Sequence, residues 1–200
     1  MLALVSGFQP FGGDAVNPAR EAMLALRGRR FGPWEVAGLE LPVVFAQAGE
    51  LLIEALPAHR PQLLIMLGLS SGRPELSVER LAVNLADAFI PDNAGAKPQD
   101  APVVPGGPAA YLSTAPTRRM AAAIQAAGVP ARLSYTAGTY VCNYVYYLAL
   151  HHLAVTGSDL PAVFIHVPPL PAQVVDKRGQ PSMALPTIVA GVEAALLAVG

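Results

Sequence analysis

Short apolar runs alternate with helix-like segments through the first third of the chain. The runs at residues 2–6, 34–43 and 62–68 have the length and composition of buried strands. Between them, residues 17–27 and 45–56 have the spacing of amphipathic helices. A strand–helix–strand–helix–strand order predicts parallel strands joined by right-handed crossovers. We therefore expect an α/β fold in which a mostly parallel twisted sheet carries helices on both faces.

Both of these helices carry local signals. Asn17 followed by Pro18 is typical of a helix start, with Asn as the N-cap and Pro at the first helical position. In the second helix, four apolar side chains at helical spacing are expected to face inward: Leu51, Leu52, Ala55 and Leu56.

The rest of the chain continues the same alternation around one long loop. Residues 87–110 contain five Pro and three Gly, and loops of this length in a compact domain are usually functional or mobile. Pro186 is compatible with a helix only in its first turn. The expected strands are 76–86, 131–135 and 161–167, and the expected helices are 116–127, 140–152 and 183–199.

Composition narrows the classes of protein to which the chain can belong. Its 200 residues suit one domain, residues 1–200, with a sizeable core. Apolar residues make up 53% and charged residues 14%, which favours a sheet covered on both faces and further burial between copies in a homo-oligomer. No run approaches the roughly 18–20 apolar residues of a membrane span, and residues 1–6 lack the basic region of a signal peptide. We expect no membrane partner.

Charge and cysteine content narrow the classes further. The net charge is −1 and the basic residues are scattered, which argues against a nucleic-acid partner. A single cysteine excludes an internal disulfide and fits a reducing, cytoplasmic location. The adjacent His151 and His152 with one cysteine are poorly spaced for zinc, so we expect no metal.

The only cysteine, Cys142, lies at a predicted helix start. Thr139 is the expected N-cap, which places Cys142 in the first helical turn. Backbone N–H groups and the helix dipole at that position favour a thiolate, so Cys142 is a candidate nucleophile. The alternative is that Cys142 is a small buried apolar residue, as lone cysteines in reduced proteins usually are.

Two further residues have types and positions that agree with Cys142. His166 lies at the end of a predicted strand, and Glu79 lies on the apolar face that it is expected to share with Leu81, Val83 and Leu85. Helix starts and strand ends meet at the carboxyl edge of a doubly wound sheet. There His166 could accept the thiol proton or hold an ion pair with Cys142, while Glu79 orients the imidazole.

Each of these two residues also has a structural interpretation. His166 could be a satisfied, partly buried histidine. Glu79 could belong to an ion pair with Arg73 or Arg80.

The turn at residues 7–13 (GFQPFGG) joins a predicted strand to a predicted helix. Phosphate binding is the weaker interpretation, because Gly13 stands where a P-loop needs Lys and no G-x-G-x-x-G occurs. Phe8 and Phe11 are better suited to holding a flat, uncharged ring, although they could simply pack in the core.

Several stretches together resemble the pyroglutamyl peptidase I (pyrrolidone-carboxylate peptidase) family of cysteine peptidases. They follow the family's order and cover nearly the whole chain. The stretches are 7–13 with Asn17 and Pro18, 68–73 running to 78–84, 90–93, 107–111 with Ser113, 137–144 with His151 and His152, and 164–168.

This resemblance implies removal of an N-terminal pyroglutamyl residue from peptides, without metal or cofactor. It also implies a phosphorylase/hydrolase-like α/β fold and a homotetramer. The catalytic residues would be Cys142 as nucleophile, His166 as general acid and base, and Glu79 as orienting acid. The family's pocket positions fall on Phe8, Phe11, Asn17, Leu69, Ile90, Tyr140 and Val141.

Two positions depart from the family pattern. Phe89 stands where the family usually has Arg, and Val43 stands where Thr is common. We therefore expect weakened activity, unless Arg73 or Arg80 substitutes for the missing cation. A non-catalytic protein that binds pyroglutamate or a similar small molecule is the alternative function.

Overall fold

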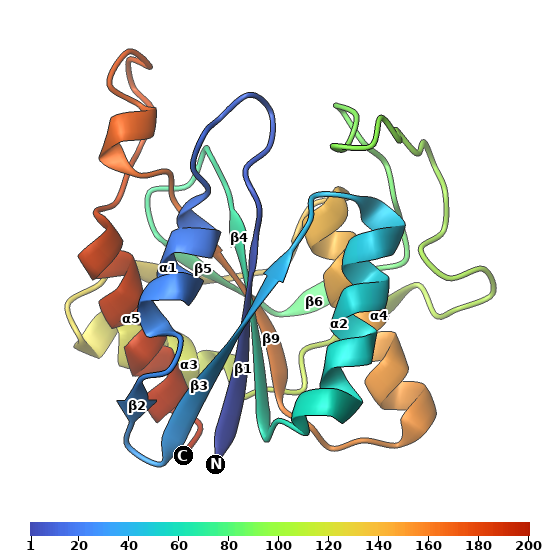
Figure 1. The fold of residues 1–200 in the computed structure, drawn as a ribbon, viewed down its shortest axis with the longest axis horizontal. Coiled ribbons are helices and arrows are strands. Elements are labelled where there is room, and N and C mark those ends of the chain that lie inside the picture. The colour runs from blue at the N-terminus through green and yellow to red at the C-terminus, as the bar shows by residue number, and fades with distance from the viewer.

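A computed structural model describes all residues, 1–200, and centres them on a seven-stranded sheet (Figure 1). The order across the sheet is β2-β3-β1-β4-β9-β5-β8, and β6 and β7 form a separate two-stranded sheet. The strands are β1 (Leu2–Phe8), β2 (Arg30–Phe31), β3 (Trp34–Leu41), β4 (Leu63–Leu69), β5 (Leu76–Glu79), β6 (Leu81–Val83), β7 (Ala110–Leu112), β8 (Ala131–Ser134) and β9 (Ala162–Val167).

The large sheet is mostly parallel, as the sequence predicted. Strand β1 pairs in parallel with β3 and β4, β4 pairs in parallel with β9, and β5 with β8. Only β2 against β3 and β5 against β9 are antiparallel. The α/β fold class is therefore confirmed.

Five α-helices cover the two faces of this sheet (Figure 1). They are α1 (Pro18–Leu26), α2 (Phe45–His59), α3 (Thr117–Ala126), α4 (Val141–Thr156) and α5 (Leu185–Leu197), with a short 3₁₀ turn, η1 (Pro171–Gln173). Helices α1, α3 and α5 pack on one face, and α2 and α4 pack on the other. No helix combines the length and apolar character that crossing a membrane requires.

The continuous apolar runs arise because both faces of the central strands are buried. In β1, Ala3 and Val5 belong to the core under α1 and α5, whereas Leu4 belongs to the core under α2 and α4. In β4, Ile65 likewise belongs to the core under α1 and α5, and Leu64 belongs to the core under α2 and α4. A strand buried on both faces needs no polar alternation, which explains the pattern in the sequence.

Two of the local predictions made for the helices are confirmed. The Asn17 side chain accepts a hydrogen bond from Ala19 N at 3.0 Å, so Asn17 is the N-cap of α1. Pro186 lies in the first turn of α5.

Two other local predictions are wrong. Thr139 is not the N-cap of α4, because its hydroxyl instead donates to the carbonyl of Asp87 and the helix begins at Val141. In α2, Leu51 faces outward, while Leu52, Ala55 and Leu56 are buried as expected.

The predicted strand over residues 76–86 is wrong as a single element. The chain turns at Arg80, whose N–H donates to Ser134 O and whose carbonyl accepts from Ser113 N. Strand β5 ends in the large sheet and β6 begins in the small one. Glu79 therefore does not share a face with Leu81, Val83 and Leu85, and lies fully buried in the large sheet.

Residues 84–109 contain no helix or named strand, in agreement with the predicted loop. Internal contacts nevertheless fix its path. The carboxylate of Asp92 accepts hydrogen bonds from the N–H groups of Phe45, Ala94 and Ala96 at 2.8–3.0 Å. Asn84 bonds both backbone groups of Val104.

Candidate active site

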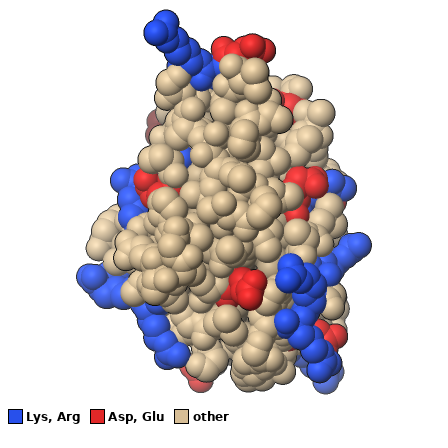
Figure 2. Space-filling model, turned by 90° about the vertical axis from the view of Figure 1, so that its left-hand side faces the viewer, with Lys and Arg blue, Asp and Glu red and all other residues tan.

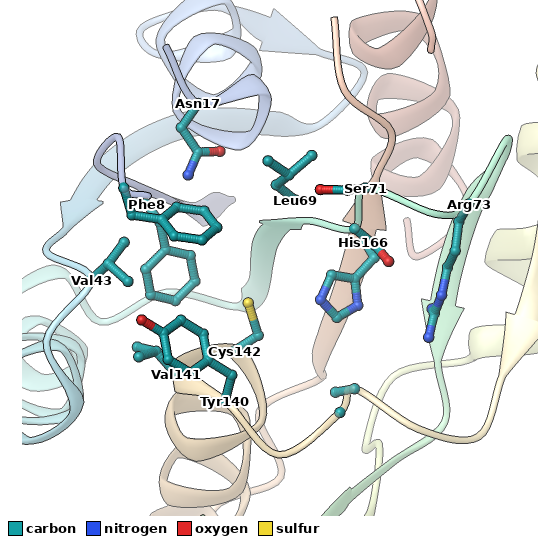
Figure 3. A pocket seen from close by; sticks show the side chains of 14 residues that line it. Phe8, Asn17, Val43, Leu69, Ser71, Arg73, Tyr140, Val141, Cys142 and His166 are labelled. Carbon is teal, nitrogen blue, oxygen red and sulfur yellow. The ribbon is translucent and has the colours of Figure 1, made fainter. Parts of the chain in front are cut away.

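A pocket of about 270 Å³ opens at the carboxyl edge of the sheet. Phe8 ends β1, Leu69 ends β4, and His166 is the second-last residue of β9. The start of α4 closes the opposite side (Figure 3). The pocket is lined by Phe8, Phe11, Asn17, Val43, Leu69, Ser70, Ser71, Arg73, Ala137, Gly138, Tyr140, Val141, Cys142 and His166. This is the edge at which open α/β sheets bind their ligands.

His166 and Glu79 are hydrogen-bonded within the buried sheet. The distance from His166 Nδ1 to Glu79 Oε1 is 2.8 Å, and both side chains are almost completely buried. An ionised carboxylate only accepts hydrogen bonds, so Nδ1 carries the hydrogen. That tautomer leaves the lone pair of Nε2 free, which is the requirement for a histidine that takes a proton from a nucleophile.

Glu79 has a second cationic partner, Arg73. Arg73 Nη1 lies 2.6 Å from the same Oε1 atom. The guanidinium also donates to Ser134 Oγ at 3.2 Å and to Thr136 O at 2.9 Å. Glu79 Oε2 is buried with no hydrogen-bond partner. The two interpretations of Glu79 considered from sequence, orienting acid and ion-pair member, therefore occur together on one oxygen.

Cys142 is the second residue of α4, and its sulfur points into the pocket (Figure 3). A Cβ atom placed on Gly68 would lie 2.9 Å from Cys142 Sγ and 2.6 Å from the Phe164 ring. Gly68 is therefore required for the sulfur to approach the end of β4. The ring of Phe164 also packs on the His166 imidazole, with centroids 4.8 Å apart.

The electrostatics at Cys142 differ from the expectation for a helix start. Burial, which has the larger effect, and the nearby Glu79 carboxylate raise the pKa of the thiol to about 12. The Cys142 backbone N–H and Arg73 act in the opposite direction, but their effect is smaller. The resting residue at neutral pH is therefore a thiol, and a base must take its proton before it can attack.

Aromatic side chains form the wall opposite His166. Phe11 and Tyr140 have ring centroids 6.2 Å apart, and Tyr140 packs edge-on against Phe45. Asn17 is buried, and its amide donates to Gln9 O while its oxygen caps α1. Both ends of its side chain thus hold the turn that carries Phe8 and Phe11.

Most of the predicted pocket positions line this cavity, and one does not. Phe8, Phe11, Asn17, Leu69, Tyr140 and Val141 are lining residues, whereas Ile90 lies half-exposed on the loop 84–109. The residues that sequence reasoning did not name as lining are Ser70, Ser71, Ala137 and Gly138. They lie within the stretches 68–73 and 137–144 that carry the family resemblance, but the sequence analysis assigned them no role in the pocket.

The structure argues against phosphate binding at residues 7–13. The first helical residue of α1 is Pro18, which has no N–H group, and Asn17 already occupies the N–H of Ala19. The start of α1 therefore offers few of the donors that an anion needs. Gly12 and Gly13 have positive φ angles and form an exposed turn.

Neither arginine considered as a substitute is directed at the sulfur. Arg73 lies on the side of His166 away from Cys142 (Figure 3), where three acceptors hold it. Arg80 lies over the ring of Tyr135, 5.7 Å from its centroid. The side chain of Phe89 is 87% exposed.

Comparison with known proteins identifies the family. A family model described as pyroglutamyl peptidase matches residues 1–200. The chain belongs to the pyroglutamyl peptidase family. A pyrrolidone-carboxylate peptidase from Pyrococcus furiosus is 47% identical over 90% of this chain and 86% of the relative. One from Cupriavidus necator is 46% identical over 96% and 90%, respectively.

Solved pyroglutamyl peptidase structures have the same fold. The pyroglutamyl peptidase I from Bacillus amyloliquefaciens superimposes with a TM-score of 0.96 at 37% identity, over 99% of this chain and 94% of that one. A mutant pyrrolidone carboxyl peptidase from Pyrococcus furiosus gives 0.95 at 43% identity, over 100% and 98%.

Proposed function

We propose that this pyroglutamyl peptidase cleaves N-terminal pyroglutamyl residues from peptides with Cys142 as nucleophile, His166 as general acid and base, and Glu79 as orienting acid. The observation that carries the proposal is that Cys142 and His166 line one pocket while His166 donates to the buried Glu79 at 2.8 Å. The family match over residues 1–200 supports the same activity. The match and the single large sheet also support one domain over these residues.

The first half of the reaction forms a thioester. As Cys142 Sγ attacks the pyroglutamyl carbonyl, Nε2 of His166 takes the thiol proton, and negative charge develops on the carbonyl oxygen. The N–H of Cys142 has no helical acceptor at this second position of α4, and it can donate to that oxygen. His166 then returns the proton to the departing amine as the C–N bond breaks.

The second half regenerates the enzyme. His166 takes a proton from a water molecule, whose oxygen attacks the thioester carbon. The C–S bond breaks, the sulfur regains a proton from His166, and pyroglutamate leaves. These steps use only groups of this chain and water.

The pocket also accounts for selectivity. A lactam ring is flat and uncharged, and the walls formed by Phe8, Phe11, Val43 and Tyr140 present apolar and aromatic surface. An ordinary N-terminus would have to leave its ammonium group without water in this cavity, which is costly. The substrate class is therefore peptides whose N-terminus is pyroglutamate.

A fluorogenic pyroglutamyl amide tests the nucleophile. We expect the wild type to release the fluorophore and Cys142→Ser to lose turnover by at least about 10³-fold while keeping the melting temperature. Val155→Ala, at the exposed far end of α4, is the matched control and should retain activity. Equal turnover in wild type and Cys142→Ser would remove the proposal.

Phe89, in place of the family's usual Arg, favours a second candidate function: a protein that binds pyroglutamate without hydrolysing peptides. Neither Arg73 nor Arg80 is directed at the sulfur. This candidate requires measurable affinity for pyroglutamate and no iodoacetamide-sensitive hydrolysis. A burst of fluorophore equal to the enzyme concentration would refute it.

A homo-oligomer, with a tetramer as the specific expectation, also belongs to the proposal. Figure 2 views the face that carries α5 and the projecting segment near η1, where uncharged side chains cover the middle and charged ones lie mostly toward the edge. Val175 and Leu197, exposed by 79% and 46%, belong to these segments. Burial of such surface favours association. Sedimentation as a monomer at micromolar concentration would contradict it.

A cytoplasmic location is proposed from the single free cysteine, because a reactive thiol is kept reduced in that compartment. Fractionation with detection of the protein tests it. Recovery outside the cytoplasm would contradict it.

A further inference from the structure

Arg73 and His166 share one acceptor atom. Arg73 Nη1 lies 2.6 Å and His166 Nδ1 lies 2.8 Å from Glu79 Oε1. The carboxylate is fully buried, and only 18% of the Arg73 side chain is exposed. A guanidinium is charged at every physiological pH, so the charge of Glu79 is compensated whether or not His166 is protonated.

We propose that Arg73 is a positioning residue that keeps His166 unprotonated, and therefore able to act as a base, at neutral pH. This inference rests on the proposed function. A buried carboxylate alone, 2.8 Å from an imidazole, would favour the imidazolium form. An imidazolium cannot accept the proton of Cys142. The positive charge of Arg73 opposes the uptake of that extra proton.

The direction of this effect does not depend on which group holds the proton. A proton added to the hydrogen-bonded pair of His166 and Glu79 makes either an imidazolium or a neutral carboxyl group. Arg73 disfavours both, because each adds positive charge beside the guanidinium. Loss of the Arg73 charge therefore favours the protonated pair in either case.

The charged side chains that face His166 are those of Glu79 and Arg73. Glu79 faces His166 from β5 and Arg73 from the turn before β5, while Cys142 and Tyr146 approach from α4. Burial raises the pKa of the Cys142 thiol and of the Tyr146 hydroxyl, so both are neutral near pH 7. The neighbouring strand β4 contributes only apolar residues and Gly68.

The position of the guanidinium is fixed by neutral acceptors. Ser134 Oγ and the carbonyl of Thr136 hold it behind Glu79. In Figure 3, Arg73 lies beyond His166 as seen from Cys142. Arg73 thus acts on the base through Glu79 and does not touch the reacting atoms.

The pH profile of kcat/KM for the fluorogenic pyroglutamyl amide tests the proposal. In Arg73→Gln the acidic limb should move up by about one pH unit, so that activity falls about tenfold below the limb and much less above it. Arg73→Lys keeps the charge and should keep the limb near its wild-type position, even if it melts earlier. An unmoved limb in Arg73→Gln, a limb that moves down, or the same loss at every pH would overturn the proposal.

A measurement without turnover covers the case in which Arg73→Gln does not fold. The protonation state of the His166 ring at neutral pH can be read by NMR in Cys142→Ser. The proposal expects a neutral imidazole that carries its hydrogen on Nδ1, where Glu79 accepts it. An imidazolium at neutral pH would overturn it. Failure of the proposed function would instead appear as wild-type enzyme without hydrolysis at any pH.

A separate observation concerns the rim of the pocket. Asp87 exchanges two hydrogen bonds with Thr139, at 2.9 and 2.7 Å, and Pro91 O accepts from the hydroxyl of Tyr140 at 3.1 Å. Phe89 lies two residues from each anchor, so its Cα is within about 7 Å of both anchor residues. Its side chain is nevertheless 87% exposed, and Ile90 beside it is 46% exposed.

We infer that Phe89 and Ile90 form an apolar surface for the side chain that follows pyroglutamate. This inference also rests on the proposed function. A cavity of about 270 Å³ holds the lactam ring, so the remainder of the peptide lies outside it. The segment that carries Phe89 and Ile90 is tied to Thr139 and Tyr140, which directly precede the helix that carries Cys142. An exposed aromatic ring there gains contact area only when a substrate covers it. The favoured substrates are peptides with a large apolar second residue.

Paired substrates test this inference. The wild type should hydrolyse a pyroglutamyl-Phe peptide with kcat/KM about tenfold above that for pyroglutamyl-Ser, and Phe89→Ala should reduce the ratio about fivefold. Val155→Ala should leave the ratio unchanged. A ratio near one in the wild type, or the same ratio in Phe89→Ala, would overturn the inference. Absence of turnover with every pyroglutamyl peptide would count against the proposed function instead.

Discussion

The sulfur of Cys142 rests against Gly68, the second-last residue of strand β4. A Cβ atom at Gly68 would lie 2.9 Å from Cys142 Sγ and 2.6–2.7 Å from two atoms of the Phe164 ring. Residue 68 therefore decides how closely the start of α4 approaches the sheet. The arrangement of the Cys142 sulfur, the His166 imidazole and the Phe164 ring therefore depends on the absence of a side chain at residue 68.

The first prediction concerns this contact. Gly68→Ala should lower the free energy of unfolding by about 1–3 kcal/mol, because the ring and the sulfur must both move. Turnover should fall by at least tenfold, because the sulfur is displaced from its place beside His166. Urea unfolding and the fluorogenic assay measure the two effects. Gly72→Ala is the control, since nothing lies within 4 Å of its added carbon. Equal behaviour of the two variants would contradict the prediction.

The second prediction concerns stability in alkali. The unfolded chain releases its thiol proton from about pH 8.5, whereas burial raises the pKa of Cys142 in the folded state to about 12. The folded state therefore holds more protons above pH 8.5, and the free energy of unfolding falls as pH rises. Between pH 8.5 and 10, the wild type should lose about 1–2 kcal/mol more than Cys142→Ala. Parallel denaturation curves at several pH values measure it, and equal slopes would refute it.

The third prediction concerns Asn143, which follows Cys142, the proposed nucleophile. Its buried amide donates to Val83 O and Leu85 O and accepts from Val83 N, at 2.9–3.0 Å. Asn143→Ala should cost about 2–4 kcal/mol in the free energy of unfolding, because three partly buried backbone groups lose their partner. Asn93→Ala, which removes one exposed hydrogen bond, is the control and should cost much less. Thermal and chemical unfolding measure both, and similar losses in the two variants would contradict the prediction.

The fourth prediction concerns the departure at Phe89. We expect weakened turnover in the wild type, and we expect Phe89→Arg to raise kcat by about tenfold or more. A guanidinium on this anchored segment could donate to the developing oxyanion. Steady-state kinetics with the fluorogenic amide measure the change. Phe89→Gln, which adds polarity without charge, is the control. A kcat for Phe89→Arg that is no higher than that of Phe89→Gln would contradict the prediction.

Local patterns predicted those elements whose chemistry is local. The N-cap at Asn17 and the Pro at the start of α1 were predicted correctly because both act within a few residues of themselves. The strand expected over residues 76–86 was wrong because its break at Arg80 is made by bonds to Ser134 and Ser113, which are distant in sequence. Thr139 failed as an N-cap for the same reason, since its hydroxyl bonds to Asp87.

The sequence by itself determined the α/β order, the burial of β1 and β4 on both faces and the three residue types proposed for catalysis. The tertiary structure alone decided that Arg73 and His166 meet on one oxygen of Glu79 and that Cys142 is held as a thiol. Hydropathy and capping are properties of neighbouring residues, so they can be read along the chain. Hydrogen-bond sharing and desolvation depend on atoms that only folding brings together, and no local pattern contains them.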